Sequence, residues 1–301
     1  MIKGLVSIII PTHNRASLVV EAINSAIGQS YPEKQIIVID DGSTDDTRSK
    51  LSDLPEIEYH YQENKGQGAA RNYGLSFAKG EFIASLDSDD LWDTDFLSQG
   101  VDCLQEFDLD FVFVDWKKIR SGQLSPSEWL KHEKWKPFQK NQHGEWSLLA
   151  PEEVRRLFLD ICPAPSSSIL VRRSSIFSGW GEQMQIADDW YLLLEIALRR
   201  SCRAAFSLTP RWKKRVDGQN VYDGQPPIET LRKLYLHDQP IFRKDFGEYL
   251  TRKEKLRLTQ NKWKYRLFLS IRTALRSKFA VRAGIPAIIA PINAIIRRLT
   301  D

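Results

Sequence analysis

This sequence of 301 residues predicts an α/β fold: a Rossmann-like, mostly parallel sheet flanked by helices, followed by a basic helical extension. Apolar, β-branched runs alternate with helical patterns at the spacing of right-handed β-α-β units, which cover both faces of a parallel sheet. Polar residues follow several of these runs, at the strand ends where such sheets bind ligands. Lys and Arg gather near the C-terminus, which indicates a separate segment there.

The first 115 residues show the alternation of strands and helices most clearly. Continuous apolar runs predict buried strands, and apolar residues spaced by three and four predict helices. Proline lacks the N–H that a strand ladder needs, so we expect Pro11 to end the first strand, and we expect Gly80 to close the third helix. The expected strands cover residues 5–10, 35–39, 57–61, 82–86 and 110–114, and the expected helices cover 18–27, 45–54, 68–78 and 94–107.

Regular patterning stops between Lys117 and Ala150, a stretch rich in Trp, Lys, Gln and Gly that we expect to form a long surface loop or lid. Order returns after it, with a helix expected over 152–159, a strand over 167–171 and a helix over 187–199. Two short strands are expected over 204–208 and 211–213. The basic tail begins near Arg243 and is expected to be helical through residue 277.

Composition restricts the class of protein. A hydrophobic content of 42% supports an ordinary packed core. The three cysteines, at 103, 162 and 202, show neither paired nor metal-ligand spacing, which favours a reducing compartment. The N-terminus leads directly into a strand pattern, so no signal peptide is expected, and no apolar stretch reaches membrane-spanning length. These observations favour a cytoplasmic protein.

The C-terminal tail concentrates positive charge. Residues 243–301 carry 15 Lys/Arg against 4 Asp/Glu, whereas the rest of the chain carries 28 against 35. Apolar residues spaced by four, from Trp263 to Leu275, alternate with basic ones. One interpretation is an interfacial helix on anionic lipid within residues 262–298, and the other is a helix packed on the main domain with a solvated basic face. Nucleic acid is not expected as a partner, because no aromatic platform or binding motif accompanies the charge.

The acidic run Asp87-Ser88-Asp89-Asp90 directly follows the apolar run 81–86. Carboxylates crowded at a strand end repel one another unless a cation neutralises them. Oxygen ligands favour Mg²⁺ or Mn²⁺, and such an ion usually completes its shell with substrate phosphates. The run therefore predicts a metal-bound nucleoside diphosphate site, the alternative being a solvated acidic turn. Polar residues at two other strand ends, 12–15 and 40–41, favour the ligand site.

Five segments, in order over residues 5–220, resemble the motifs of family-2 glycosyltransferases, which are inverting enzymes of the GT-A fold. The segments are 6–15, 38–45, 68–75, 80–90 and 167–190. Five ordered motifs are more specific than any one. Two positions depart from the family: Asp188 precedes Asp189 where the family often has Glu-Asp, and Asp217 stands where a later basic loop often has His. The second departure puts a contact from that loop to the leaving diphosphate in doubt.

The resemblance implies roles for the acidic residues. Asp89 is expected to bind Mn²⁺ or Mg²⁺ directly, with Asp87 supporting the ion or the ribose. Asp90 is either a further ligand or the cap of the next helix. Asp189 is expected to be the general base, and Asp188 to orient it, to contact the donor or to cap its helix.

The resemblance also implies a nucleotide-binding surface. Asp41 matches the carboxylate that accepts the imide N–H of uracil, and His13 stands where the family often has Tyr, so that it stacks on the base or packs on Pro11. Arg71 either reaches the diphosphate or sugar or pairs with the acidic loops. Thr12, Asn14 and Arg15 contact the nucleotide or close the turn. The further expected contacts are Pro11, Asp87, Ser88, Asp188 and Arg215.

The expected function is transfer of a sugar from a nucleotide-diphospho-sugar, a UDP-sugar by resemblance, to a hydroxyl of a glycan or lipid-linked acceptor. Residues 1–240 would form the catalytic domain, with 1–115 binding the nucleotide and 116–240 the acceptor, and 241–301 the extension. The resemblance and the tail imply bacterial surface polysaccharide or lipopolysaccharide synthesis, peripheral on the inner face of the plasma membrane. The alternatives are a sugar-nucleotide nucleotidyltransferase, whose Gly-rich basic loop is absent after the first strand, and a non-catalytic binding module, which Asp189 disfavours.

Overall fold

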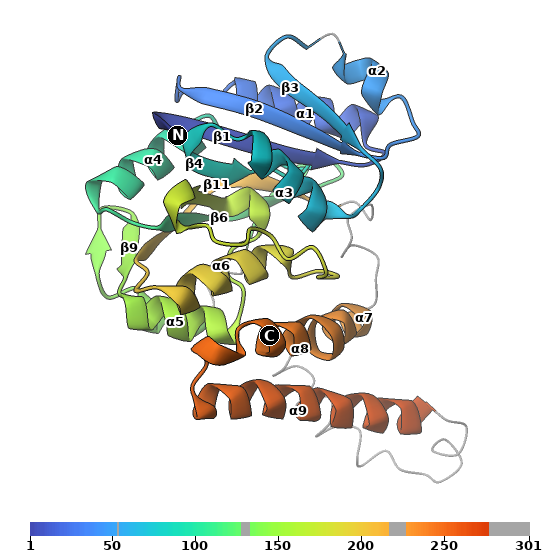
Figure 1. The fold of residues 1–301 in the computed structure, drawn as a ribbon, viewed down its shortest axis with the longest axis vertical. Coiled ribbons are helices and arrows are strands. Elements are labelled where there is room, and N and C mark those ends of the chain that lie inside the picture. The colour runs from blue at the N-terminus through green and yellow to red at the C-terminus, as the bar shows by residue number, and fades with distance from the viewer. Residues whose placement is uncertain (53, 128–132, 217–226, 277–301) are drawn as a thin grey trace. The chain divides into compact units, whose positions relative to one another are not determined.

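A computed structural model describes residues 1–52, 54–127, 133–216 and 227–276. The chain divides into two units, residues 1–250 and 251–301. In the first unit, the described residues form one mixed sheet of eleven strands (Figure 1). The predicted α/β architecture, with a mostly parallel sheet flanked by helices, is therefore confirmed.

The N-terminal half of the sheet is parallel. The strand β1 (Ile2–Thr12) lies between β2 (Lys34–Asp41) and β4 (Gly80–Ser85), and β3 (Ile57–Gln62) pairs with β2. The prediction that Pro11 ends the first strand is wrong, because Pro11 pairs in register with Ile39 and the strand continues to Thr12. The fixed φ of proline is compatible with extended backbone.

Helices cover both faces of this half. On one face, α1 (Ala16–Ile27) packs on alternate strand residues that include Ile8 and Val38, and α4 (Phe96–Glu106) extends the same layer over the second half of the sheet. On the other face lies α3 (Gln67–Phe77), where a side chain at Gly74 would collide with Ile9. The small helix α2 (Thr47–Leu51) is shorter than predicted. Gly80 does not close α3, since the helix ends at Phe77 and Gly80 begins β4.

The second half of the sheet is mixed. The strand β10 (Ile169–Arg172) runs antiparallel to both β4 and β6 (Phe111–Arg120), whereas β11 (Ala204–Arg215) runs parallel to β6. The sequence predicts two short strands here, and the structure has the single strand β11. The strand is continuous because its pairing with β6 shifts register between Ser207 and Trp212 instead of stopping. The short strand β5 (Leu91–Trp92) pairs with β11.

The prediction of a surface loop or lid over residues 117–150 is wrong for its described part. There β6 continues to Arg120 and pairs with β7 (Gln123–Pro126), and β9 (Trp146–Leu149) pairs with β8 (Gln142–His143) and β11. A 3₁₀ turn, Glu133–Phe138, buries Trp135, whose ring lies near Phe206. Trp135 fills the core from a turn that has neither a helix nor a strand period, so the sequence pattern did not predict its burial.

The remaining helices of the first unit follow the sheet. α5 (Pro151–Asp160) places Phe158 on Phe111 and Phe113, and α6 (Asp188–Arg199) packs beside α5. A π-helical turn, Lys233–Asp238, joins α7 (Pro227–Arg232) to α8 (Gln239–Asp245). The division of this unit into nucleotide and acceptor halves stays a prediction.

In the second unit the described element is α9 (Arg252–Arg276), which bears out a helical tail to residue 276. Thr251 and Glu254 exchange hydrogen bonds at its start, as in a capping box. Residues 277–301, and with them most of the predicted membrane segment 262–298, lie outside the described residues. Among the described residues, no helix has both the length and the apolar character that crossing a membrane requires.

Candidate active site

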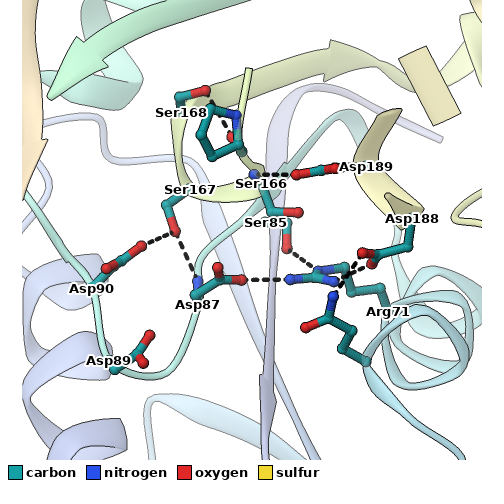
Figure 2. Close-up of polar contacts among 12 residues, drawn as sticks. Arg71, Ser85, Asp87, Asp89, Asp90, Ser166, Ser167, Ser168, Asp188 and Asp189 are labelled. Atoms are coloured by element: carbon teal, nitrogen blue, oxygen red, sulfur yellow. Dashed lines mark hydrogen bonds and ion pairs between the residues drawn. The ribbon is translucent and has the colours of Figure 1, made fainter. Parts of the chain in front are cut away.

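The carboxyl ends of β1, β2 and β4 meet at one edge of the sheet, because these strands are parallel neighbours. The strand β10 runs antiparallel to β4, so the 3₁₀ turn Ser166–Ser168 before it reaches the same edge. Figure 2 shows this turn between the loop after β4 and the first residues of α6, Asp188 and Asp189. Residues from five separate segments therefore converge at the edge where the sequence predicts a ligand.

The acidic loop, Asp87–Asp90, gathers three carboxylates. One oxygen from each of Asp87, Asp89 and Asp90 lies within 4.8 Å of the others. Asp90 is 1% exposed and accepts hydrogen bonds from the Ser167 hydroxyl (2.7 Å) and the Arg215 N–H (3.2 Å). The helix-cap alternative for Asp90 is wrong, because β5 follows it and α4 begins only at Phe96.

Burial and mutual repulsion disfavour ionisation of these carboxyls. Burial, followed by the charge of Asp87, raises the pKa of Asp89 to about 6, against the opposing effects of Arg15 and Lys214. Burial also raises the pKa of Asp90 well above its ordinary value. A divalent cation would favour the charged forms, and an all-carboxylate donor set suits Mg²⁺ or Mn²⁺. The residues present therefore fit such an ion.

Arg71, on α3, is 2% exposed and connects the acidic loop to α6. Its guanidinium forms ion pairs with Asp87 (2.5 Å) and with Asp188, and its Nε donates to the Ser85 hydroxyl (3.1 Å). Asp188 also accepts from the Gln67 side chain at 2.7 Å. The structure thus gives Arg71 the ion pairs that were its alternative role, and it commits Asp188 to Arg71 and Gln67.

Asp189 lies in the first turn of α6 and is partly buried. Its carboxylate accepts the N–H of Ser166 (3.1 Å) and the N–H of Trp190 (2.7 Å). Burial and then the charge of Asp188 raise its pKa to about 7, whereas Arg71 opposes the shift. A carboxylate that titrates near neutrality and is held by two N–H donors is suited to accept a proton.

Sequence analysis missed Asp238, which positions the start of α6. Its side chain is fully buried, and it accepts the N–H groups of Gln185, Ile186 and Ala187 at 3.0–3.1 Å. His237 supplies a fourth hydrogen bond (2.7 Å). No local pattern marks this residue, because its partners lie about 50 positions earlier in the chain.

The part of the site that the sequence predicts to bind the nucleotide is built from three loops. Both oxygens of Asp41 accept hydrogen bonds, from the Gln62 side chain and from the N–H groups of Lys65 and Gly66 (2.7–2.8 Å). His13 is exposed, and its Nδ1 donates to the Asp41 carbonyl at 2.8 Å. The uracil contact expected of Asp41 stays a prediction, since the structure shows the carboxylate holding the loop before α3.

The segment after β1 ties these loops together. Asn14 has a positive φ of 51° and its side chain accepts the N–H of Thr44 at 2.8 Å. Arg15 lies 3.9 Å from the Asp89 carboxylate. Thr12 is buried, and its hydroxyl has no hydrogen-bond partner among the described residues.

Arg215 ends β11 beside the acidic loop. Its guanidinium pairs with Glu21 at 2.8 Å and donates to the Asp89 carbonyl at 3.3 Å. The contact to the leaving diphosphate expected of it stays a prediction. Asp217 lies outside the described residues. Pro11 and Ser88 are buried, at the end of β1 and inside the acidic loop.

A chain of contacts thus joins most of the predicted site. His13 and Asn14 link the Asp41 side to the loop after β1, Arg15 links that loop to Asp89, and Ser166–Ser167 link the acidic loop to Asp189. Five separate segments of the sequence therefore contribute to one polar edge.

The sequence of this chain is similar to sequences of known proteins. The sequence model described as Glycosyl transferase family 2 matches residues 7–177. The UDP-Glc:alpha-D-GlcNAc-diphosphoundecaprenol beta-1,3-glucosyltransferase WfgD of Escherichia coli is 32% identical over 123 residues, 40% of this chain and 49% of that protein. The matches to the first curated relatives span only 18–35% of those relatives' length.

Two solved structures have the same fold. Staphylococcus aureus TarS 1-349 in complex with UDP-GlcNAc is 19% identical with a TM-score of 0.60, over 96% of this chain and 78% of that one. The mannosyltransferase PcManGT of Pyrobaculum calidifontis, in complex with GDP-Man and Mn²⁺, is 18% identical with a TM-score of 0.61, over 100% and 80%. At such identity the likeness shows the fold.

Proposed function

This chain belongs to glycosyltransferase family 2, and from that premise we propose that it is a metal-dependent, inverting enzyme that uses a nucleotide-diphospho-sugar. The observation that carries the proposal is that the site contains both a cluster of three carboxylates and a separate aspartate, Asp189. A turn of two adjacent serines, Ser166 and Ser167, contacts both. An inverting transfer needs these two parts, one for the leaving diphosphate and one for the attacking hydroxyl.

The acidic loop would hold Mn²⁺ or Mg²⁺ through Asp89, with Asp87 and Asp90 as the other carboxylates of the cluster. Such an ion, when bound, offsets the negative charge that develops on the leaving diphosphate. Arg71 keeps the Asp87 carboxylate in place, because its guanidinium is itself fixed by Asp188 and Ser85. The Ser167 hydroxyl and the Arg215 N–H do the same for Asp90.

Asp189 would take the proton of the acceptor hydroxyl. As it does so, the oxygen of that hydroxyl bonds to the anomeric carbon of the donor sugar, and the bond from that carbon to the diphosphate oxygen breaks. Attack opposite the leaving group inverts the configuration at that carbon. The N–H groups of Ser166 and Trp190 hold the carboxylate in one orientation. General-base assistance of this kind contributes about 10²–10⁴-fold to a rate.

The donor is proposed to be a UDP-sugar. WfgD is named for UDP-Glc, and TarS was solved with UDP-GlcNAc. The exposed His13 ring beside the Asp41 loop would stack on the nucleobase of the donor. The acceptor is proposed to be a glycan or lipid-linked hydroxyl in bacterial surface polysaccharide synthesis, in line with the diphosphoundecaprenol acceptor in the name of WfgD.

A donor-hydrolysis screen across UDP-, GDP- and other nucleotide sugars tests this function. We expect slow release of UDP from one UDP-sugar with Mn²⁺ or Mg²⁺, and none with EDTA. Asp89→Asn should lower the rate by about 10²–10³-fold, as expected for loss of a group that stabilises the leaving charge. The control is Asp108→Asn, because the Asp108 side chain is 90% exposed. Hydrolysis that survives EDTA and Asp89→Asn would refute the metal-dependent mechanism.

The second unit is proposed to rest on the anionic inner face of a membrane. Leu256, Trp263 and Leu267 lie seven and four residues apart on α9 and are 57–63% exposed, with basic neighbours such as Arg266. Apolar residues with adjoining Lys and Arg bind anionic bilayers. The competing interpretation, a helix packed on the main domain, predicts no lipid binding.

Vesicle sedimentation separates the two interpretations. We expect the full chain to pellet with phosphatidylglycerol vesicles and not with phosphatidylcholine vesicles. Trp263→Ser combined with Leu267→Ser should weaken binding by about tenfold or more, given the area removed from lipid contact. Leu124→Ser is the matched control, since Leu124 is an exposed leucine of the first unit. Equal behaviour with both lipids would exclude the anionic surface.

A further inference from the structure

We propose that Ser167 is a positioning residue that fixes the metal-binding carboxylates relative to Asp189. The inference rests on the proposed function of the acidic loop and assigns a role to a residue that does not itself bind the donor. It concerns the 3₁₀ turn Ser166–Ser168, which Figure 2 shows between the acidic loop and α6.

The Ser167 hydroxyl is used twice, and the residue is 0% exposed. It donates to the Asp90 carboxylate at 2.7 Å and accepts the N–H of Asp87 at 3.1 Å. One hydroxyl therefore joins the side chain at the end of the acidic loop to the backbone at its beginning. The two ends of the acidic loop are thereby held together.

The neighbouring residue reaches the opposite part of the site. The Ser166 N–H donates to Asp189 at 3.1 Å. The two contacts start from adjacent residues, whose Cα atoms a planar peptide holds about 3.8 Å apart. The acidic loop and Asp189 are therefore both hydrogen-bonded to adjacent residues whose backbone spacing is fixed.

The turn is itself anchored in the core. The buried Trp92 donates its indole N–H to the Ser167 carbonyl at 2.7 Å. The Ser168 hydroxyl makes a local contact instead, donating to the Pro165 carbonyl three residues earlier at 2.7 Å. The turn can serve both sides because β10 is antiparallel to β4, which brings the residue before β10 beside the residue after β4.

Without the Ser167 hydroxyl, the Asp90 carboxylate would keep the bond from the Arg215 N–H, at 3.2 Å, as its remaining hydrogen bond among the described residues. A buried carboxylate that loses a hydrogen bond is no longer held in one orientation, and a ligand that is not held in place weakens a cation site. Removing a residue that orients metal ligands typically costs about 10–100-fold in metal affinity or activity.

The test measures Mn²⁺ binding to the full chain by calorimetry without donor, alongside kcat and the Mn²⁺ dependence of donor hydrolysis. Ser167→Ala should weaken Mn²⁺ affinity by about tenfold or more and move the Mn²⁺ requirement for hydrolysis to higher concentration. Ser168→Ala, which removes a hydroxyl of the same buried turn, should leave Mn²⁺ affinity unchanged. Ser167→Cys fills the position with a slightly larger side chain that is a weak donor, so it should behave like Ser167→Ala and carries the test if alanine unfolds the protein.

Two results would overturn the inference alone: wild-type Mn²⁺ affinity in both Ser167 variants, or an equal loss in Ser168→Ala. Failure of the wild-type chain to bind Mn²⁺ would instead overturn the proposed function, and the inference with it. Thermal midpoints of all variants identify any loss that comes from unfolding.

Discussion

Arg71→Met is expected to destabilise the folded protein by about 3–5 kcal/mol, because it leaves the buried Asp188 and the half-buried Asp87 without their counter-charge. Arg71 is the shared partner of Asp87 and Asp188, and the Asp188 side chain is only 3% exposed. Burial by itself lowers the pKa of Arg71, but the charges of Asp188 and Asp87 outweigh it and raise that pKa above its ordinary value. The guanidinium is therefore charged throughout the working pH range. Urea denaturation at neutral pH measures the loss.

Two further variants make this prediction specific. Lys50→Met removes an ion pair between two exposed side chains, Lys50 and Asp46, and should cost at most about 1 kcal/mol. Arg71→Lys keeps the charge but lacks the planar fork that contacts three groups at once, so it should be intermediate in stability and reduced in activity. A free energy of unfolding that falls no further in Arg71→Met than in Lys50→Met would contradict the role of Arg71 as the link between the two acidic segments.

Asp189→Asn is expected to lower kcat by about 10²–10⁴-fold while the protein still binds the donor, because an amide cannot accept the acceptor proton. The amide is close in size to the carboxylate, so binding of the donor on the other side of the turn should persist. Donor binding by calorimetry and sugar transfer to an acceptor measure the two properties separately. Unchanged transfer by Asp189→Asn would remove the base assignment.

The pH profile gives an independent readout of the same residue. Burial and the charges of Asp188 and Asp87 raise the pKa of Asp189 to about 7, against Arg71. A base acts when it is deprotonated, so activity should rise as pH increases through about 7 and level off above it. Asp189→Asn should lose this rise, and Asp108→Asn, an exposed aspartate of the same type, should keep it. A wild-type rate that falls with increasing pH over this range would count against Asp189.

Local pattern predicted most of the first 115 residues, because strand and helix periods there are set by which face each residue buries. It was least accurate over 117–150, where Trp135 and Trp146 pack into the core from a turn and a short strand. It also misplaced Pro11 and Gly80, since their backbone preferences are compatible with more than one position in a strand. Irregular elements are stabilised by tertiary contacts that no period records.

The candidate active site likewise contains some features that the sequence predicted and others that it did not. The acidic loop and Asp189 stood out because several carboxylates lie close together in the chain, which a short segment reveals. Arg71 forms the ion pairs that were one of its two open roles, and the contacts of Asp238 and Ser167 were not predicted from the sequence. Arg71 and Asp188 are 117 positions apart, and Ser167 and Asp90 are 77 apart. Such partners are determined by which strands become neighbours.

The sequence alone determined the succession of strands and helices, the family resemblance and the clustering of Asp87, Asp89 and Asp90, since each depends on residues adjacent in the chain. Only the tertiary structure decided which groups hold those carboxylates. The insertion of β10 antiparallel between β4 and β6 brings the serine turn to the acidic loop, and the packing of α3 and α6 buries Arg71 beside Asp188. Hydrogen bonds and ion pairs of this kind depend on distances in space, which the order of residues does not state.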